Sequence, residues 1–258
     1  MLKLALSLAA LGALTADLSA QTPSDHVELG VAAEEAHDVR TALQHYQAAL
    51  DQDSANYEAN WRGAMTLLTL GEQLPASGKN PERDSLYVQA ARYARRAVAS
   101  NPAGADGHFA LAASLGRESL TKGKKDRIRA AAEIRREALR TLALNPRHDG
   151  AYHILGRWNA EIMRISGLSR FFAKKFLGAG VFNQASWDQA IYNMEKAVEL
   201  DSTRVYHHLE LAEIYADRKR IADAKSQLRI VDSLPEREVM DSAYKREGAA
   251  LRKRLAKR

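Results

Sequence analysis

The side chains of this 258-residue chain that are best suited to chemistry are histidines and carboxylates, because the sequence contains no cysteine. The lack of cysteine excludes disulfides, thiolate nucleophiles and cysteine-ligated metal centres. His148, Asp149 and His153 lie near the start of an expected helix, and His207 and His208 are neighbours. A His-Glu-x-x-His zinc motif, a nucleophile elbow and a phosphate-binding loop are absent from the sequence. The sequence therefore predicts a protein that is not an enzyme and has no cofactor and no metal site.

These residues also have a structural interpretation. Asp149 suits the N-terminal cap or first turn of a helix, where a carboxylate accepts hydrogen bonds from free backbone N–H groups. His207 and His208 cannot face the same way on a helix, because adjacent residues point to different sides. We therefore expect these groups to contribute to packing and hydrogen bonding.

A second feature is an aromatic and basic segment, residues 165–185. It contains four of the 5 phenylalanines and several cations but no acidic residue. On a short helix, Leu168 and three of the phenylalanines would share one face, which suits an anionic membrane surface, a lipid or a partner groove. The alternative is that the phenylalanines fill the protein core and the cations are solvated. The candidate membrane or lipid residues are Phe171, Phe172, Lys174, Lys175 and Phe176, with Phe182 nearby.

A repeated pattern determines how all of these residues are positioned. With 46% hydrophobic and 27% charged residues and only 6 prolines, the composition is typical of a soluble helical protein. Ala190-x-x-x-Met194-x-x-Ala197 recurs 34 positions later from Ala224. This spacing is the period of the tetratricopeptide (TPR) helix pair. Further copies begin at Ala42, Ala90 and Ile134.

The repeat predicts stacked helix pairs. Small residues at positions i and i+7 allow two helices to approach closely, and the larger residue at i+4 fills the space between them. Asn101-Pro102 and Asn145-Pro146 end helices, because proline lacks an N–H group and restricts the residue before it. We expect helices over residues 24–37, 40–52, 56–71, 82–100, 104–119, 124–144, 148–165, 185–200, 204–217, 221–233 and 236–256.

The fold class is therefore all-α: a TPR-like α-solenoid of about five helical hairpins plus a C-terminal capping helix. Residues 1–20, with Lys3 before a short apolar run and small residues before Gln21, are predicted to be a signal peptide. Residues 21–258 form the solenoid, and residues 236–258 form its basic capping helix. We expect an exported protein, either periplasmic or secreted.

The segment Leu155-Gly156-Arg157-Trp158, followed by the aromatic and basic insertion and by residues 185–201, resembles the TPR domain of the regulator of microtubule dynamics family. A weaker match extends upstream and downstream. The resemblance implies a non-enzymatic TPR adaptor. Eukaryotic members associate with microtubules, mitochondria or membrane contact sites, whereas this chain begins with an apparent secretory signal.

Two functions remain open. The first is binding of a protein or peptide in the concave groove of the solenoid, where first helices present exposed side chains. The groove candidates are Trp61, Phe109, His153, Arg157, Glu161, Tyr206 and Glu213. The second is docking on an anionic membrane surface or lipid through residues 165–185. A nucleic-acid partner is not expected, because the formal net charge of +6 is mild and no reader module is present.

Overall fold

The computed structural model describes residues 21–75, 78–167 and 180–257. These residues form eleven α-helices and two short 3-10 helices, and they contain no strand. The expected all-α fold is therefore confirmed. The α-helices are α1 (Pro23–Glu35), α2 (Val39–Gln52), α3 (Tyr57–Gln73), α4 (Pro81–Ser100), α5 (Ala105–Glu118), α6 (Lys124–Leu144), α7 (Asp149–Arg164), α9 (Trp187–Leu200), α10 (Val205–Asp217), α11 (Ile221–Ser233) and α12 (Asp241–Ala256).

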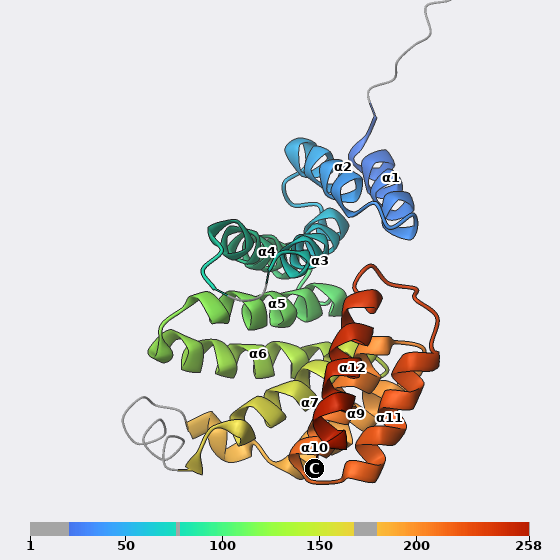
Figure 1. Cartoon of the computed structure of the whole chain (residues 1–258). Coiled ribbons are helices and arrows are strands. Elements are labelled where there is room, and N and C mark those ends of the chain that lie inside the picture. The colour runs from blue at the N-terminus through green and yellow to red at the C-terminus, as the bar shows by residue number, and fades with distance from the viewer. Residues whose placement is uncertain (1–20, 76–77, 168–179, 258) are drawn as a thin grey trace, which may run out of the picture.

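The helices pair in sequence order and the pairs stack, as the repeat predicts. The hairpins are α1 with α2, α3 with α4, α5 with α6, α7 with α9, and α10 with α11. Figure 1 shows the stack running from α1 down to α10, with α12 lying across one side of it. α12 packs on α10 and α11, where a capping helix must cover the last hairpin.

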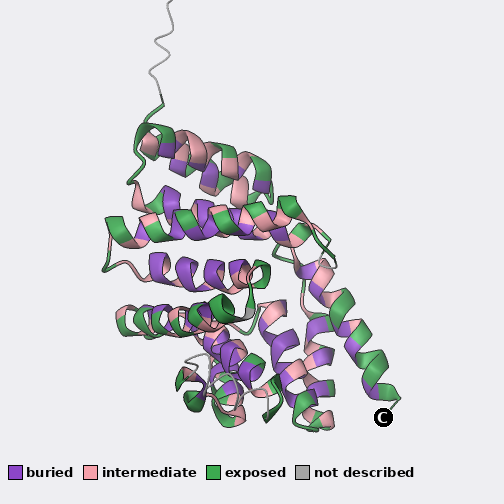
Figure 2. Ribbon diagram, turned by 90° about the vertical axis from the view of Figure 1, so that its left-hand side faces the viewer, coloured by how far each residue is buried: buried purple, intermediate pink, exposed green. Residues whose placement is uncertain are grey.

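The small–large–small pattern forms the core of each hairpin. Ala42, Tyr46 and Ala49 on α2 are fully buried, and the equivalent residues of the other four copies are buried as well. Gly30 on α1 faces the Tyr46 ring so closely that an added Cβ would lie 2.5 Å from Tyr46 Cε1. Figure 2 shows that the helices in the middle of the stack are largely buried, whereas α12 has exposed residues along its outer side.

Four of the five second helices end in the same way. The first four, α2, α4, α6 and α9, end before an Asp or Asn whose side-chain oxygen accepts a hydrogen bond from the backbone N–H two residues later, so this oxygen stabilises the turn after the helix. The bonds join Asp53 to Ala55 at 3.0 Å, Asn101 to Ala103 at 3.2 Å, Asn145 to Arg147 at 3.1 Å and Asp201 to Thr203 at 3.0 Å.

A polar residue in the fourth position of several first helices fastens the preceding turn. Its side-chain nitrogen donates to the carbonyl oxygen six residues earlier, at 3.0 Å in all three cases: Asn60 to Ser54, His108 to Pro102 and His208 to Ser202. The second ring nitrogen of His108 lies 2.6 Å from Glu137 on α6, and that of His208 lies 2.6 Å from Gln227 on α11. These histidines therefore join the two helices of one hairpin to the turn before it.

The last helix differs from the expectation. It begins at Asp241, not at residue 236. The Asp241 carboxylate accepts hydrogen bonds from the backbone N–H groups of Arg237 and Glu238, both at 2.8 Å, and this holds the preceding residues in a turn. Among the described residues, none of the helices is long and apolar enough to cross a membrane.

Candidate functional site

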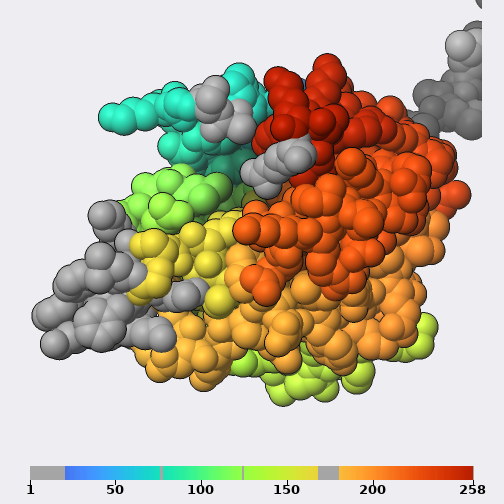
Figure 3. All heavy atoms as spheres, turned by 60° about the horizontal axis from the view of Figure 1, so that its bottom comes forward, coloured from blue at the N-terminus to red at the C-terminus, as the bar shows by residue number. Residues whose placement is uncertain are grey.

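The first helices of hairpins two to five converge on one face of the stack. Tyr244 on α12 donates to Glu72 Oε2, at the end of α3, at 3.1 Å. Since α3 belongs to the second hairpin and α12 packs on the fifth, the stack curves toward this side, which we call the concave face. Figure 3 shows the C-terminal segment, orange to red, meeting the yellow and teal parts of the chain on one surface.

A set of charged and aromatic residues links the helices on this face. We call it the concave cluster: Glu72, Arg117, Arg157, Tyr206, Glu210 and Tyr244. Arg117 on α5 pairs with Glu72, and Arg157 on α7 donates to the Tyr206 hydroxyl on α10. Arg157 also pairs with Glu210 at 3.2 Å. Tyr206 and Tyr244 stack, with ring centroids 4.3 Å apart and an interplanar angle of 14°. The cluster therefore joins four first helices and α12.

The charges in the concave cluster are matched. The Glu210 carboxylate and Tyr206 raise the pKa of Arg157. Burial raises the pKa of the Tyr206 hydroxyl. At neutral pH the guanidinium groups are therefore charged and the phenols un-ionised, and the ion pairs and the ring stacking stabilise the contact between hairpins.

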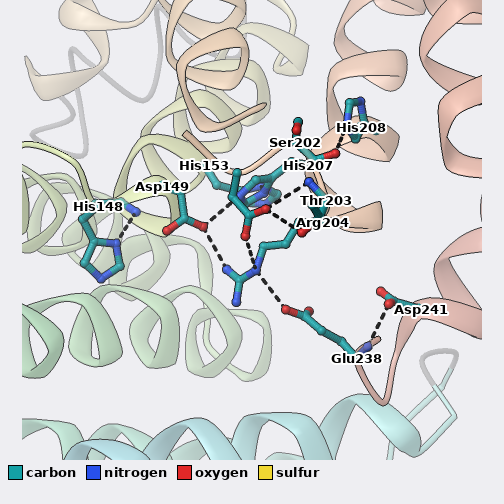
Figure 4. Close-up of polar contacts among 12 residues, drawn as sticks. His148, Asp149, His153, Ser202, Thr203, Arg204, His207, His208, Glu238 and Asp241 are labelled. Atoms are coloured by element: carbon teal, nitrogen blue, oxygen red, sulfur yellow. Dashed lines mark hydrogen bonds and ion pairs between the residues drawn. The ribbon is translucent and has the colours of Figure 1, made fainter. Parts of the chain in front are cut away.

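A buried histidine pair lies behind this face (Figure 4). His153 Nδ1 and His207 Nδ1 are 2.9 Å apart, and His207 Nε2 lies 3.0 Å from Asp149 Oδ2. Both bonds form if neutral His153 donates through Nδ1–H to His207 Nδ1 and His207 donates through Nε2–H to Asp149. Burial and the neighbouring His207 lower the pKa of His153, which favours this neutral state.

Asp149 connects the histidine pair to the last loop. Arg204 Nη1 lies 3.1 Å from Asp149 Oδ2, and Arg204 Nε lies 2.9 Å from Glu238, just before α12. Burial alone would raise the pKa of Asp149, but the bond from His207 and the charge of Arg204 lower it well below its usual range. Asp149 is a first-turn residue, and the preceding His148 provides the cap by accepting from Ala151 N at 3.2 Å. His207 and His208 point in different directions, as expected (Figure 4).

The predicted groove residues occupy different environments. His153 is buried, so the expectation that it is exposed is wrong: its ring lies between the hairpins, against His207 and Tyr206. Phe109 is half-buried and packs on the His148 ring, with centroids 4.5 Å apart. Trp61 is also half-buried, and the Arg62 guanidinium lies 4.5 Å from its ring centroid.

Arg157 and Tyr206 belong to the concave cluster, beneath α12. Glu161 is exposed and pairs with Arg164 at 2.7 Å. Glu213 is half-buried and lies 3.7 Å from Arg164. The structure thus brings together Arg157, Tyr206, Glu161 and Glu213 on one face and separates Trp61 and Phe109 from them.

A hollow of about 420 Å³ opens beside the concave cluster, between α7, α10 and α12. We call it the α10–α12 hollow. Its lining combines an apolar floor with charges of both signs: Arg164, Glu213, Ala216, Asp217, Lys219, Leu251, Arg254 and Leu255. Burial, followed by the charge of Glu210, raises the pKa of Glu213 to about 7. This hollow offers carboxylate, guanidinium and aliphatic contacts within one small volume.

The aromatic and basic segment is only partly described. Phe171, Phe172, Lys174, Lys175 and Phe176 lie outside the described residues. Phe182 is buried and belongs to the same apolar cluster as Trp158 and Ile162. The core interpretation therefore applies to Phe182, and the membrane interpretation of the other five stays a prediction. The described residues contain no group of three or more histidines and carboxylates placed to hold a metal ion.

Four of the six residues of the concave cluster were not predicted as site residues from the sequence: Glu210 on α10, and Glu72, Arg117 and Tyr244. Glu72, Arg117 and Tyr244 lie at the ends of α3 and α5 and in α12. Nothing in the helix repeat relates Glu72 to Tyr244, which follows it by 172 positions. Their contact depends on the curvature of the whole stack, so it cannot be predicted from the sequence of a single repeat.

Comparisons with known proteins agree with this architecture. The family model described as Regulator of microtubule dynamics protein 1-3 matches residues 26–256. No curated protein matches the chain. Among solved structures, TTC0263, a thermophilic TPR protein in Thermus thermophilus, has a TM-score of 0.63 and 18% identity, covering 88% of this chain and 97% of that one. PilF of Pseudomonas aeruginosa has a TM-score of 0.51 and 15% identity, covering 88% and 87%. At these identities the two structures show a common TPR-type fold alone.

Proposed function

Because the chain belongs to the Regulator of microtubule dynamics protein 1-3 family, we propose that it is a non-enzymatic scaffold that binds a protein or peptide on its concave face. The α10–α12 hollow is the observation that carries this proposal. It lies at the curved side of a TPR-type solenoid, and such solenoids use their concave surfaces for binding. It also combines apolar floor residues with cations and carboxylates, the mixture that fixes the orientation of a peptide.

The position of α12 limits where the ligand binds. Tyr244 covers Tyr206 and reaches Glu72, so α12 already occupies the middle of the concave face. The hollow lies toward the other end of α12, where Leu251 and Leu255 form its floor and Arg254 is exposed at its edge. A bound peptide therefore contacts α12 as well as α7 and α10.

Site-specific photo-crosslinking tests this placement. A photoreactive amino acid replaces Arg254, which lines the hollow, and in a second variant it replaces Lys253, which is exposed on the same helix but does not line it. We expect a protein to be captured in cells from position 254 and not from position 253. Equal capture from both positions, or from neither, would contradict the assignment.

A binding measurement with the captured protein provides the quantitative test. In the full chain, Arg254→Glu introduces a repulsive charge beside Glu213 and Asp217, and we expect affinity to fall about tenfold, or ~1.4 kcal/mol. Lys253→Glu makes the same change in charge outside the hollow and should leave affinity nearly unchanged. An unchanged affinity in a folded Arg254→Glu protein would remove the hollow from the binding site.

We also propose that the protein is exported, on the basis of the signal-like residues 1–20. N-terminal sequencing of the protein purified from its native cells tests this proposal. The expected result is a mature chain that begins at Gln21, found outside the cytoplasm. A chain that keeps Met1 and fractionates with cytoplasmic proteins would overturn it.

A further inference from the structure

The outer faces of α4 and α6 form a basic surface that the function proposed above does not use. α6 contains seven Lys or Arg residues against three Asp or Glu. Those at positions 125, 129, 136 and 140 recur at helical spacing and are exposed, so they form one stripe along α6. On α4, Arg92 and Arg95 are exposed one turn apart. We call these six cations the basic face.

Folding moves part of the negative charge of this region into the interior. In the sequence, residues 117–140 mix acidic and basic residues, which by itself favours a solvated helix face. In the structure, Glu118 and Glu137 are buried. Glu118 pairs with Lys122 at 2.9 Å, and Glu137 lies 2.6 Å from His108 and 2.9 Å from Arg136. The exposed side of α6 keeps four cations against Asp126 and the partly exposed Glu133, which pair with Arg129 and Arg136. Arg140 has no ion pair with any residue that the structure describes. The outer surface is therefore more basic than the sequence of the region indicates.

The basic face is hollowed. A depression of about 300 Å³ lies between α4 and α6, with Arg95 on one side and Arg129 on the other. Its other lining residues are Leu115, Lys122, Asp126, Ala130 and Glu133. Asp126 pairs with Arg129 at 3.2 Å at the edge of the depression. A side chain of a partner can enter between the two arginines and contact apolar atoms there.

Exposed aliphatic side chains accompany the cations. Val88 on α4, Leu120 before α6 and Leu139 on α6 are 49%, 59% and 40% exposed. Among the described residues, these are three of the six large hydrophobic side chains that are exposed. Their position beside arginines suits a partner in which carboxylates alternate with apolar residues.

The neighbouring second helix carries the opposite charge. On α9, the exposed acidic residues Asp188, Glu195 and Glu199 lie on one face around Tyr192. Repulsion at α9 therefore limits the contact of an acidic partner on the side of α6 that faces α9.

We propose that the basic face docks an acidic protein segment whose carboxylates are interleaved with apolar side chains. Arginine forks bind carboxylates with two parallel hydrogen bonds, and five of the six cations are arginines. The depression between the helices accepts side chains, whereas docking on a lipid surface relies on side chains that protrude into it. This surface lies on second helices, apart from the concave face, so the scaffold has two independent binding surfaces.

A synthetic peptide of repeated Glu-Glu-Leu units, labelled with a fluorophore, tests the proposal with the full chain. Fluorescence anisotropy should show binding that weakens as salt is raised. Arg129→Glu with Arg140→Glu should weaken binding about tenfold, or ~1.4 kcal/mol. The matched control is Lys225→Glu with Arg229→Glu, which reverses two exposed cations on the outer side of α11. It should weaken binding less than twofold.

Equal losses in the two double variants would overturn the proposal, because net charge alone would then explain binding. Binding of phosphatidylglycerol vesicles that the peptide does not displace, and that the α6 double variant loses, would also overturn it in favour of a lipid surface. Circular dichroism checks the fold of both variants. If reversal at Arg129 and Arg140 unfolds the chain, the Arg129→Gln and Arg140→Gln pair, set against Lys225→Gln and Arg229→Gln, decides the same question.

Discussion

Gly30 marks a close approach of the two helices in the first hairpin, and substitution there tests how tightly they pack. The methyl group in Gly30→Ala would meet the buried ring of Tyr46, which has no free space to move into. We expect a loss of about 1–3 kcal/mol in the free energy of unfolding, measured by urea denaturation. Gly116→Ala is the control, because nothing lies within 4 Å of the added atom. There the better helix propensity should stabilise the protein by about 0.5–1 kcal/mol. Equal effects would contradict this account of the packing.

His153 should make the protein less stable in mild acid. Its folded-state pKa lies well below the usual value of 6.5, so the unfolded chain binds a proton that the folded chain excludes. Stability from this residue is fully present above pH 6.5 and falls as pH drops below it. Between pH 7.5 and 5 we expect the wild type to lose up to about 2 kcal/mol more than His153→Gln. Urea denaturation at both pH values measures this, and an equal loss in the two proteins would show that His153 is not buried as a neutral ring.

Glu213 should act in the opposite direction over the same pH range. Its folded-state pKa is about 7, above the usual value of 4.5, so the folded chain binds the extra proton. Stability from Glu213 therefore rises as pH falls from 7 toward 4.5. In Glu213→Gln, the loss of stability on acidification should be larger than in the wild type. Thermal unfolding over pH 5–8 measures this, and an unchanged slope would indicate that Glu213 is fully solvated.

For single residues, the sequence predicted packing roles better than functional roles. Small residues at the repeat positions were expected in the core, and they are buried there. The roles of His108 and His208 in fastening turns were not predicted, although both occupy the fourth position of a first helix. This shared position can be recognised only after the first residue of each helix is known. His153 was placed on the surface because helical register does not show which residues a neighbouring hairpin covers.

At the scale of helices, Tyr57 at the start of α3 links the second hairpin to the third. Its hydroxyl accepts a hydrogen bond from Gly107 N at 2.9 Å. Tyr57→Phe removes the acceptor and should cost about 1 kcal/mol of unfolding free energy. Tyr192→Phe on the exposed side of α9 is the control and should change little. If both variants have the same stability as the wild type, the bond between the hairpins contributes nothing measurable.

Helix limits were predictable where local chemistry sets them. The helices α2, α4, α6 and α9 end at Asn or Asp residues whose side chains accept hydrogen bonds from the backbone just after them, and their ends agree with the expected ones. The expected start of α12, at residue 236, was wrong. Residues 236–240 have a sequence that suits a helix, but the Asp241 carboxylate stabilises a turn there. A turn and a helical start have similar energies here, and side-chain contacts that the periodicity does not indicate decide between them.

At the scale of the whole molecule, Tyr244 is the residue through which α12 joins the second hairpin to the last. Tyr244→Phe removes the bond to Glu72 but keeps the stacking on Tyr206. We expect backbone amides of α12 to exchange about fivefold faster, corresponding to ~1 kcal/mol. Tyr244→Ala should increase exchange further because the stacking is also lost. Amides of α2, far from this contact, provide the internal reference, and uniform acceleration along the chain would indicate global destabilisation.

The stacking of hairpins was predictable because it follows from a local period. The contact between Glu72 and Tyr244 across the concave face was not predictable. It depends on the small rotations between successive hairpins, which add up over several hairpins. The chemistry of the concave cluster therefore depends on a long-range shape that no single repeat encodes.

The bond from Tyr244 to Glu72 has a mechanical consequence. Without this bond the second and fifth hairpins are not joined through α12 at this point, and the spacing between hairpins can change when either end of the solenoid is pulled. With the bond, α12 is attached to the end of α3, and stretching must first break this contact. Force applied across residues 60 and 257 should therefore meet an initial resistance that vanishes in Tyr244→Ala, before any helix pair unravels.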